Sequence, residues 1–223
     1  MAIWHFWTSL LATSLHQLTG TVGLSPAVAI IVFTLLARAL LAPLSFTVAR
    51  RGLQRRQQLQ ALKPALDAIR QEHAGDAAAQ SAATLALYRE HGIRFLDRPQ
   101  LAYLGAQAAV GIGSWQMLAA QAFHQPFLWI ASLARPDAWL TVLVTALMVA
   151  AMAASPGMTL EPATIAMIVV STLMSAWVVS TLPAALGLSW AAASVFAVAQ
   201  GLALRAVAGG SGFHPSHAPT SAT

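Results

Sequence analysis

The chain has 223 residues, of which 57% are hydrophobic and only 9% are charged, with a formal net charge of +5 at pH 7. Soluble globular domains carry about 25% charged residues. This deficit and a mean hydropathy of +0.65 exclude an ordinary soluble fold and predict an all-α polytopic membrane protein. The sequence contains no cysteine, which excludes disulfides, thiol redox chemistry and cysteine-ligated metals.

Residues 1–21 predict an amphipathic helix at the outer membrane interface. Its large apolar side chains recur at helical spacing: Trp4, Trp7, Leu11, Leu15 and Leu18. No basic residue precedes the apolar stretch, in contrast to a secretory signal peptide. We therefore expect the helix to lie in the interface with its tryptophans at the headgroups. A signal-like segment that stays uncleaved and inserts is the alternative.

Residues 22–48 predict the first transmembrane helix, and residues 49–98 predict a basic helical hairpin. Its first arm carries Leu59, Leu62, Leu66 and Ile69 at steps of three and four residues. Gly75 and Asp76 break this pattern before a second helix. Nine of the twelve Lys and Arg lie between residues 50 and 98, which marks this side as cytoplasmic. The segment has too few aromatic residues for base stacking, so no direct nucleic-acid contact is expected.

Residues 99–207 predict transmembrane helices two to five, at about 99–122, 138–154, 163–181 and 184–207. Residues 208–223 predict a disordered cytoplasmic tail. Five spans with the hairpin inside place the N-terminus outside and the C-terminus in the cytoplasm. Arg205, at the inner end of the last span, agrees with this orientation, whereas Arg135 lies in an outer loop.

Arg38 interrupts the first predicted span. A guanidinium stays charged at physiological pH, and at mid-bilayer it costs about 2.5–3.5 kcal/mol on insertion scales. Because no acidic residue lies in a predicted span, we expect a hydrated cavity to solvate it. A side chain that reaches the inner headgroups is the alternative, although about 18 Å separates Arg38 from Arg50 along the helix. Thr34 and Ser45 lie on the same helix face as Arg38. Candidate lining residues are Thr34, Gln107, Ser114, Ser171, Ser175 and Ser194.

Several motifs follow one another in the order found in a known family. TLLARALLAPLS (34–45) places an arginine five residues before a proline, and LYREHG (87–92) ends the basic hairpin. PFLWIASLARPD (126–137), SPG (155–157) and LPAALGLSWAAASVFAVAQ (182–200) follow. Over about residues 22 to 204 the chain resembles the YidC family of membrane protein insertases. The resemblance is to a divergent, short member without the family's large outer domain.

The resemblance implies a five-span core whose groove is open to the cytoplasm and to lipid but closed outside. It places Arg38 and Thr34 in the groove, with Trp190 where an aromatic residue lines it. It implies a multi-pass protein of a bacterial inner membrane, with nascent membrane proteins and the bilayer as partners. The ribosome or the Sec translocon is a candidate partner through the 49–98 hairpin. No cofactor, metal, catalytic residue or enzyme activity is implied.

On this interpretation a client helix passes from the groove into lipid between the third and fifth spans, while Arg38 attracts acidic client residues. Two other functions fit a lone arginine in a cavity. A small anion transporter would more often show internal repeats, and an assembly scaffold would insert nothing. The stretch GIGS (111–114) offers a serine, but no histidine lies in a predicted span to act as its base. We interpret its small residues as helix packing.

Overall fold

The computed structural model describes residues 2–93, 97–121, 123–155 and 162–210. Within these ranges the chain is helical, and Phe127 and Ile130 form an isolated β-bridge. The predicted tail beyond residue 210, most of the SPG turn and the inner loop up to Glu161 lie outside the described residues. The helices are α1 (Ala2–Gly20), α2 (Pro26–Ala61), α3 (Lys63–Glu72), α4 (Ala77–Glu90), α5 (Arg98–Ala119), α6 (Ala138–Ala154), α7 (Pro162–Thr181) and α8 (Ala184–Gly210).

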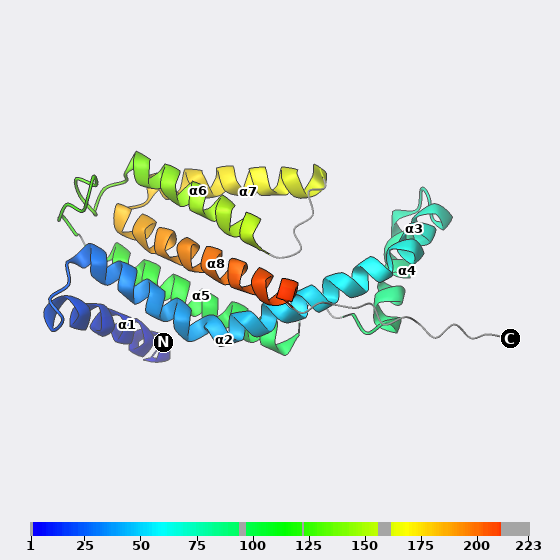
Figure 1. The fold of residues 1–223 in the computed structure, drawn as a ribbon, viewed down its shortest axis with the longest axis horizontal. Helices are drawn as coiled ribbons and strands as arrows, with labels where there is room; N and C mark the ends of the chain where they lie inside the picture. Colours follow the sequence, from blue (N-terminus) through cyan, green and yellow to red (C-terminus); the bar gives the residue numbers. More distant parts are fainter. Residues whose placement is uncertain (1, 94–96, 122, 156–161, 211–223) are drawn as a thin grey trace.

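Helices α1, α2 and α5 to α8 form an elongated bundle, and α2 continues out of it to carry α3 and α4 (Figure 1). We call the two ends of the bundle the arm end, where α2 leaves it, and the loop end, where residues 123–137 lie. Among the described residues, three helices, α2, α7 and α8, are long and apolar enough to cross a membrane, and α6 is a shorter apolar helix. An all-helical polytopic membrane protein agrees with this architecture, while the number of five spans stays a prediction.

Helix α2 is 36 residues long and runs through the predicted boundary at residue 48. Pro26 starts it, where a missing N–H costs nothing. The Gln-, Arg- and Leu-rich run after Arg50 consists of good helix formers, so the helix continues until Leu62. Pro64 then removes the N–H that would bond the Gln60 carbonyl. The predicted first arm of the hairpin is therefore divided between the end of α2 and α3.

Helices α3 and α4 pack against each other, and neither contains a buried residue. Gly75 adopts a φ of +97° in the turn between them, a conformation that glycine takes without a steric penalty. Asp76 caps α4, because its Oδ1 accepts hydrogen bonds from the Ala78 and Ala79 amides at 3.0 and 2.9 Å. The long α2 thus holds an exposed pair of helices away from the bundle.

Helix α1 packs along α5 and α2. The Trp7 indole N–H donates to the Ala109 carbonyl at 2.9 Å, and the Trp4 indole N–H donates to Gln116 Oε1 at 2.9 Å. Gly113 lies between these contacts, and a Cβ placed there would lie 2.6 Å from Leu11 Cδ1. The predicted helix is present, and its apolar stripe faces protein. Its predicted place at the membrane interface stays a prediction.

Helices α6 and α8 make the most extensive helix contact in the bundle. A Cβ on Gly201 would lie 2.8 Å from the Ala154 carbonyl oxygen, and one on Gly187 would lie 2.8 Å from Leu140 Cδ2. Small residues allow backbones to approach this closely. The third and fifth predicted spans therefore pack closely against each other, and the expected exit route between them stays a prediction.

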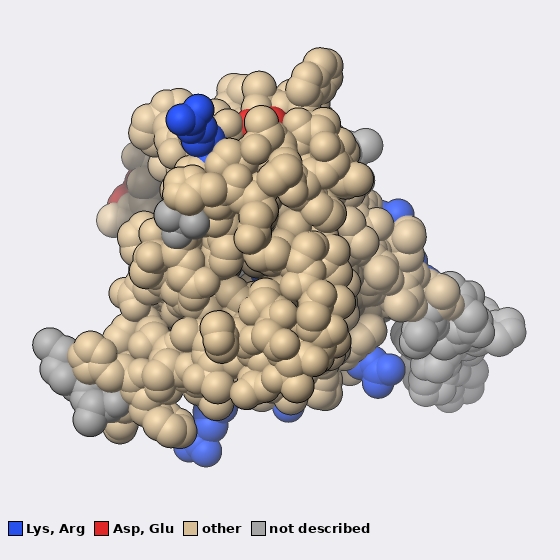
Figure 2. All heavy atoms as spheres, turned by 90° about the vertical axis from the view of Figure 1, so that its left-hand side faces the viewer, with Lys and Arg blue, Asp and Glu red and all other residues tan. Residues whose placement is uncertain are grey.

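Residues 123–137 cover the loop end. Ile130 and Leu133 of this loop are buried, and the amides of Ala184 and Ala185 donate to the carbonyls of Arg135 and Leu133, both at 3.0 Å. These bonds satisfy N–H groups that the start of α8 leaves unpaired. Figure 2 views this end and shows few charged side chains on it. The loop therefore caps the bundle with packed, mostly uncharged residues.

Candidate functional site

Helices α2, α5 and α8 enclose a cavity of about 80 Å³, which we call the Arg38 cavity. A buried water needs at least about 10–15 Å³ of such space and polar partners, so several waters fit. The polar groups that line it come from all three helices. They are Thr34 and Arg38 of α2, Gln107 and Ser114 of α5, and Ser189 and Trp190 of α8.

No carboxylate pairs with Arg38 in the part of the chain that the structure describes. The ion pairs there join Arg51 to Asp97 and Arg70 to Asp67. Asp76, Asp97 and Asp137 accept backbone hydrogen bonds as helix caps, while Glu161 lies outside the described residues. The carboxylates nearest the bundle therefore serve helix ends, and the half-buried guanidinium faces neutral polar groups.

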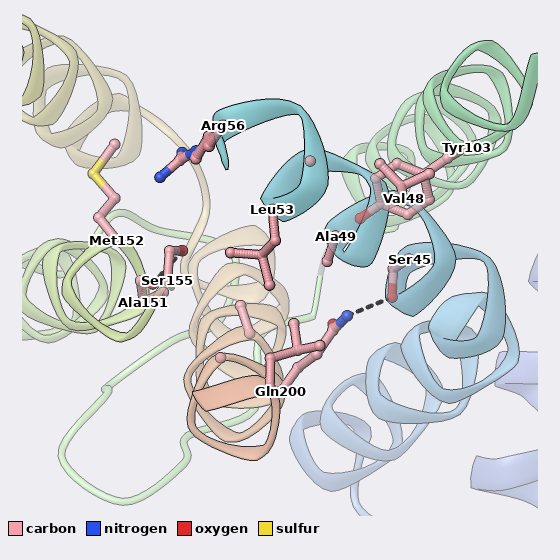
Figure 3. Close-up of a pocket in the computed structure, with 14 residues that line it drawn as sticks. Ser45, Val48, Ala49, Leu53, Arg56, Tyr103, Ala151, Met152, Ser155 and Gln200 are labelled. Atoms are coloured by element: carbon pink, nitrogen blue, oxygen red, sulfur yellow. Dashed lines mark hydrogen bonds between the residues drawn. The ribbon is translucent and has the colours of Figure 1, made fainter. Parts of the chain in front are cut away.

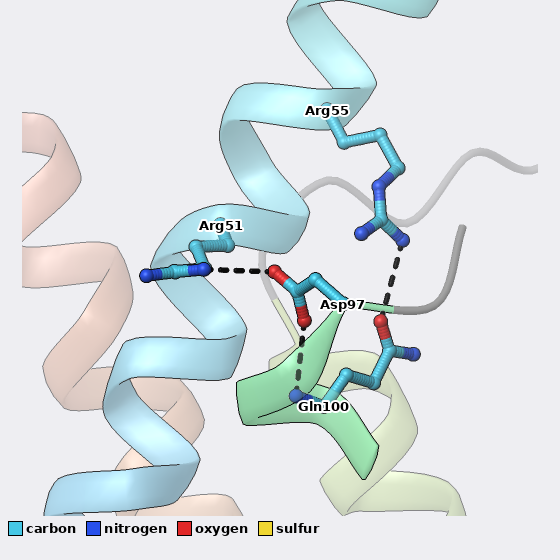
Figure 4. Close-up of polar contacts among 4 residues, drawn as sticks. All are labelled: Arg51, Arg55, Asp97 and Gln100. Atoms are coloured by element: carbon cyan, nitrogen blue, oxygen red, sulfur yellow. Dashed lines mark hydrogen bonds and ion pairs between the residues drawn. The ribbon is translucent and has the colours of Figure 1, made fainter. Parts of the chain in front are cut away.

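Arg38 lies deep along α2. Thirteen residues separate it from Arg51, which is about 20 Å at 1.5 Å per residue. Arg51 Nη1 lies 3.0 Å from Asp97 Oδ2, and Arg55 Nη1 lies 3.4 Å from Gln100 Oε1 (Figure 4). Hydrogen bonds from the Arg51 guanidinium and from the Gln100 backbone N–H lower the pKa of Asp97. These contacts fix the level at which α2 leaves the bundle, and Arg38 lies well inside it.

A second cavity of about 450 Å³ lies nearer the arm end, between α2, α5, α6 and α8 (Figure 3). We call it the vestibule. Its polar groups are Ser45 and Arg56 of α2, Tyr103 of α5, Ser155 at the C-cap of α6, and Gln200 of α8. Gln200 Nε2 donates to Ser45 Oγ at 2.7 Å, which links α8 to α2 across 155 positions of sequence. Apolar side chains such as Leu53 and Met152 complete the wall.

The structure brings five predicted residues together: Thr34, Arg38, Gln107, Ser114 and Trp190 all line the Arg38 cavity. The predicted serines elsewhere do not line it. Ser171 and Ser175 lie on α7, which packs mainly on α6. Ser194 is buried on α8, one helical step of about 100° from the lining residue Ala193.

Sequence reasoning missed the vestibule. The sequence placed Ser45 on the helix face of Arg38, seven residues after it, but did not predict that it lines a second cavity. Tyr103 had a usable signal, four residues before Gln107 on α5. No local pattern pairs Ser45 with Gln200, since their contact depends on how α2 and α8 pack.

A helical bundle with helices long and apolar enough to cross a membrane, and with an arginine in a polar cavity between them, is the architecture of a polytopic membrane protein. The family model described as 60Kd inner membrane protein matches residues 16–209. The chain therefore belongs to this family, the YidC-type membrane protein insertases, as the motifs predicted. Members of the family act on nascent membrane proteins in the membrane. Comparison with curated proteins gives no match.

Proposed function

We propose that the chain inserts client segments into the bilayer by holding their polar flank in the Arg38 cavity while their apolar part enters lipid. The observation that carries the proposal is Arg38 itself: a half-buried guanidinium, midway along the apolar part of α2, in a polar cavity and without a carboxylate partner among the described residues. A charge in the bilayer is costly and usually functional. A fixed positive charge at this depth would attract an acidic client residue.

The two cavities shorten the apolar barrier that a polar flank must cross. They extend from the vestibule past Gln107 to Ser114, so waters and hydroxyl groups would solvate the flank over much of its path. The packed loop 123–137, with Ile130 and Leu133 buried, supports a groove that is closed at the loop end. Burial of client apolar surface would drive the step, at about 25 cal/mol per Å².

The exit into lipid that the packing favours lies between α5 and α8. Gly111 and Trp115 of α5 line the Arg38 cavity and are also exposed on the bundle surface. The contact between α5 and α8 is much smaller than that between α6 and α8. A client helix would therefore leave past Trp115, where an aromatic ring can contact both lipid and cavity.

We propose five spans, formed by α2, α5, α6, α7 and α8, in a bacterial inner membrane. The arm end would face the cytoplasm, because α3, α4 and the adjoining ends of α2, α5 and α8 carry most of the basic residues. The N-terminus would then lie outside and the C-terminus inside. The exposed α3 and α4 would offer the ribosome or the Sec translocon a docking surface.

Proteoliposomes test the function directly. We expect a purified single-span client to become protease-protected in vesicles with the parent protein, and much less so with Arg38→Ala. Arg135→Ala, which removes an exposed cation at the loop end, should insert like the parent. Insertion no better than in empty vesicles would contradict the proposal and favour a scaffold. Solute uptake without client insertion would favour an anion transporter.

A further inference from the structure

One face of α2 lines both cavities. Thr34 and Arg38 lie in the Arg38 cavity, and Ser45, Gly52 and Arg56 lie in the vestibule. Arg38 and Arg56 are eighteen residues apart, which is five full turns, so they project from the same side of the helix. About 27 Å of helix separates the two. The vestibule and the Arg38 cavity are therefore successive parts of one track along α2.

The two cavities nevertheless share no lining residue. On α5 the lining changes cavity between Tyr103 and Gln107, and on α8 it changes between Ala193 and Ala197. On α2 it changes between Arg38 and Ser45. The hydrogen bond from Gln200 to Ser45 crosses from α8 to α2 (Figure 3), and Ser45 is the first vestibule residue after Arg38 on α2.

The Ser45 hydroxyl both donates and accepts a hydrogen bond. Ser45 is 8% exposed, and its hydroxyl donates to the Ala42 carbonyl at 2.9 Å and accepts from Gln200 at 2.7 Å. In the protein without a client, separating the Ser45 and Gln200 side chains would leave the hydroxyl oxygen and the amide N–H without hydrogen-bond partners in a poorly solvated region, which is energetically unfavourable. A client peptide group carries one donor and one acceptor, so it can replace both halves of the bond.

We propose that the Ser45–Gln200 hydrogen bond is a gate between the vestibule and the Arg38 cavity, opened by the polar backbone or side chains of a client. This inference rests on the proposed insertase function. The vestibule would receive the client flank first, with Arg56 at its mouth favouring acidic segments. Ser45 and Gln200 would then control access to Arg38 from the vestibule, so that the deep cavity is closed on this side when no client is present.

Cysteine labelling tests the gate, because the sequence has no other cysteine. Thr34→Cys reports on the Arg38 cavity and Gly52→Cys on the vestibule, where a Cβ has no neighbouring atom within 4 Å. A membrane-impermeant maleimide is added to proteoliposomes without client, and each Thr34→Cys rate is divided by the Gly52→Cys rate. We expect this ratio to be well below one in the parent.

Removing either partner should open the gate. Ser45→Ala and Gln200→Leu should each raise the Thr34→Cys rate about fivefold, the factor equivalent to about 1 kcal/mol for one hydrogen bond. The double variant should label no faster than the faster single variant, since both remove the same bond. Ser155→Ala is the matched control: its hydroxyl lines the vestibule but bonds within α6, to the Ala151 carbonyl.

Three results would overturn the gate. They are a parent Thr34→Cys rate equal to that of Gly52→Cys, a rate unchanged by both substitutions, and an equal rise in Ser155→Ala. Labelling does not depend on insertion, so failure of the gate leaves the insertion assay to decide the proposed function. Conversely, if Arg38→Ala has no effect on client insertion, the proposed role of Arg38 fails, but a difference in Thr34→Cys labelling between the parent and Ser45→Ala would still support the gate.

Discussion

The Arg51 guanidinium lies 3.0 Å from the Asp97 carboxylate and ties the part of α2 that leaves the bundle to the first turn of α5 (Figure 4). The other oxygen of the same carboxylate accepts from the Gln100 amide at 3.0 Å and caps α5. One side chain therefore holds together the base of the arm and the start of a bundle helix. This contact lies where the basic part of α2, which starts at Arg50, leaves the bundle.

Asp97→Asn should lower the midpoint of thermal unfolding at pH 7, because the amide keeps a cap acceptor but loses the charge opposite Arg51. Arg51 and the Gln100 amide lower the pKa of Asp97 in the folded protein. The stabilisation is therefore complete above the unfolded pKa of about 3.9 and disappears as pH falls through the lowered folded value. Unfolding scans of both proteins from pH 7 to pH 3 measure this.

The difference between the two midpoints should narrow towards the acid end of the series and stay constant between pH 5 and pH 7. A difference that persists unchanged to pH 3 would show that the ion pair is not its source. Asp67→Asn, which removes the exposed partner of Arg70 within α3, is a suitable control and should move the midpoint less.

Gly201→Ala should destabilise the bundle, because the added Cβ would lie 2.8 Å from a backbone oxygen of Ala154. Neither backbone can move aside without separating α6 from α8. Overpacking of this kind costs about 1–3 kcal/mol of unfolding free energy. Gly105→Ala is the matched control, since its Cβ meets no atom within 4 Å and should stabilise the helix by about 0.5–1 kcal/mol. Equal effects of the two would contradict the packing.

Trp7→Phe should loosen α1, because it removes the indole N–H that donates to the Ala109 carbonyl while keeping an aromatic ring. The expected loss is about 1 kcal/mol, seen as faster limited proteolysis within residues 2–20. Trp139→Phe changes a side chain that is 75% exposed and should leave proteolysis unchanged. Identical digestion of parent and Trp7→Phe would show that this bond does not hold α1 on α5.

Gln107→Leu should weaken insertion of an acidic client, but less than Arg38→Ala does. Gln107 supplies an amide to the Arg38 cavity without carrying charge, so its loss dries the cavity and leaves the guanidinium in place. Ser194→Ala changes a buried hydroxyl outside this cavity and should insert normally. Protease protection of the client measures both. A larger defect in Ser194→Ala than in Gln107→Leu would contradict the assignment of the cavity.

The sequence predicted helices well because apolar runs and helix formers act locally. The break near Gly75 and the cap at Asp76 follow from the same local chemistry. The true end of α2 was harder to see, since hydrophobicity falls at Arg50 while helix propensity does not. The sequence could not predict which helices pack against each other. Gly201 and Gly187 allow α8 to approach α6 closely, but the residues around them in sequence do not indicate that α6 is the partner.

The candidate site divides in the same way. Arg38 and Thr34 were found because an uncompensated charge in an apolar run is visible in the sequence. Gln107 and Trp190 line the same cavity; the first was predicted from its polarity and the second from the family resemblance. Ser171 and Ser175 share a helix face, but that face belongs to α7, outside the cavity. The Ser45–Gln200 bond depends on tertiary packing alone.

The measurement that tests the central claim most directly combines a change in the client with a change at Arg38. Two single-span clients, one with an acidic outer tail and one with the same tail as Asn and Gln, are inserted by the parent, Arg38→Ala and Arg38→Lys. We predict that Arg38→Ala lowers insertion of the acidic client about tenfold, the factor for one charged hydrogen bond of about 1.4 kcal/mol. The neutral client should change little, and Arg38→Lys should restore most of the acidic client's insertion. An equal loss for both clients, or none for either, would contradict a role for Arg38 in attracting the client's acidic residues.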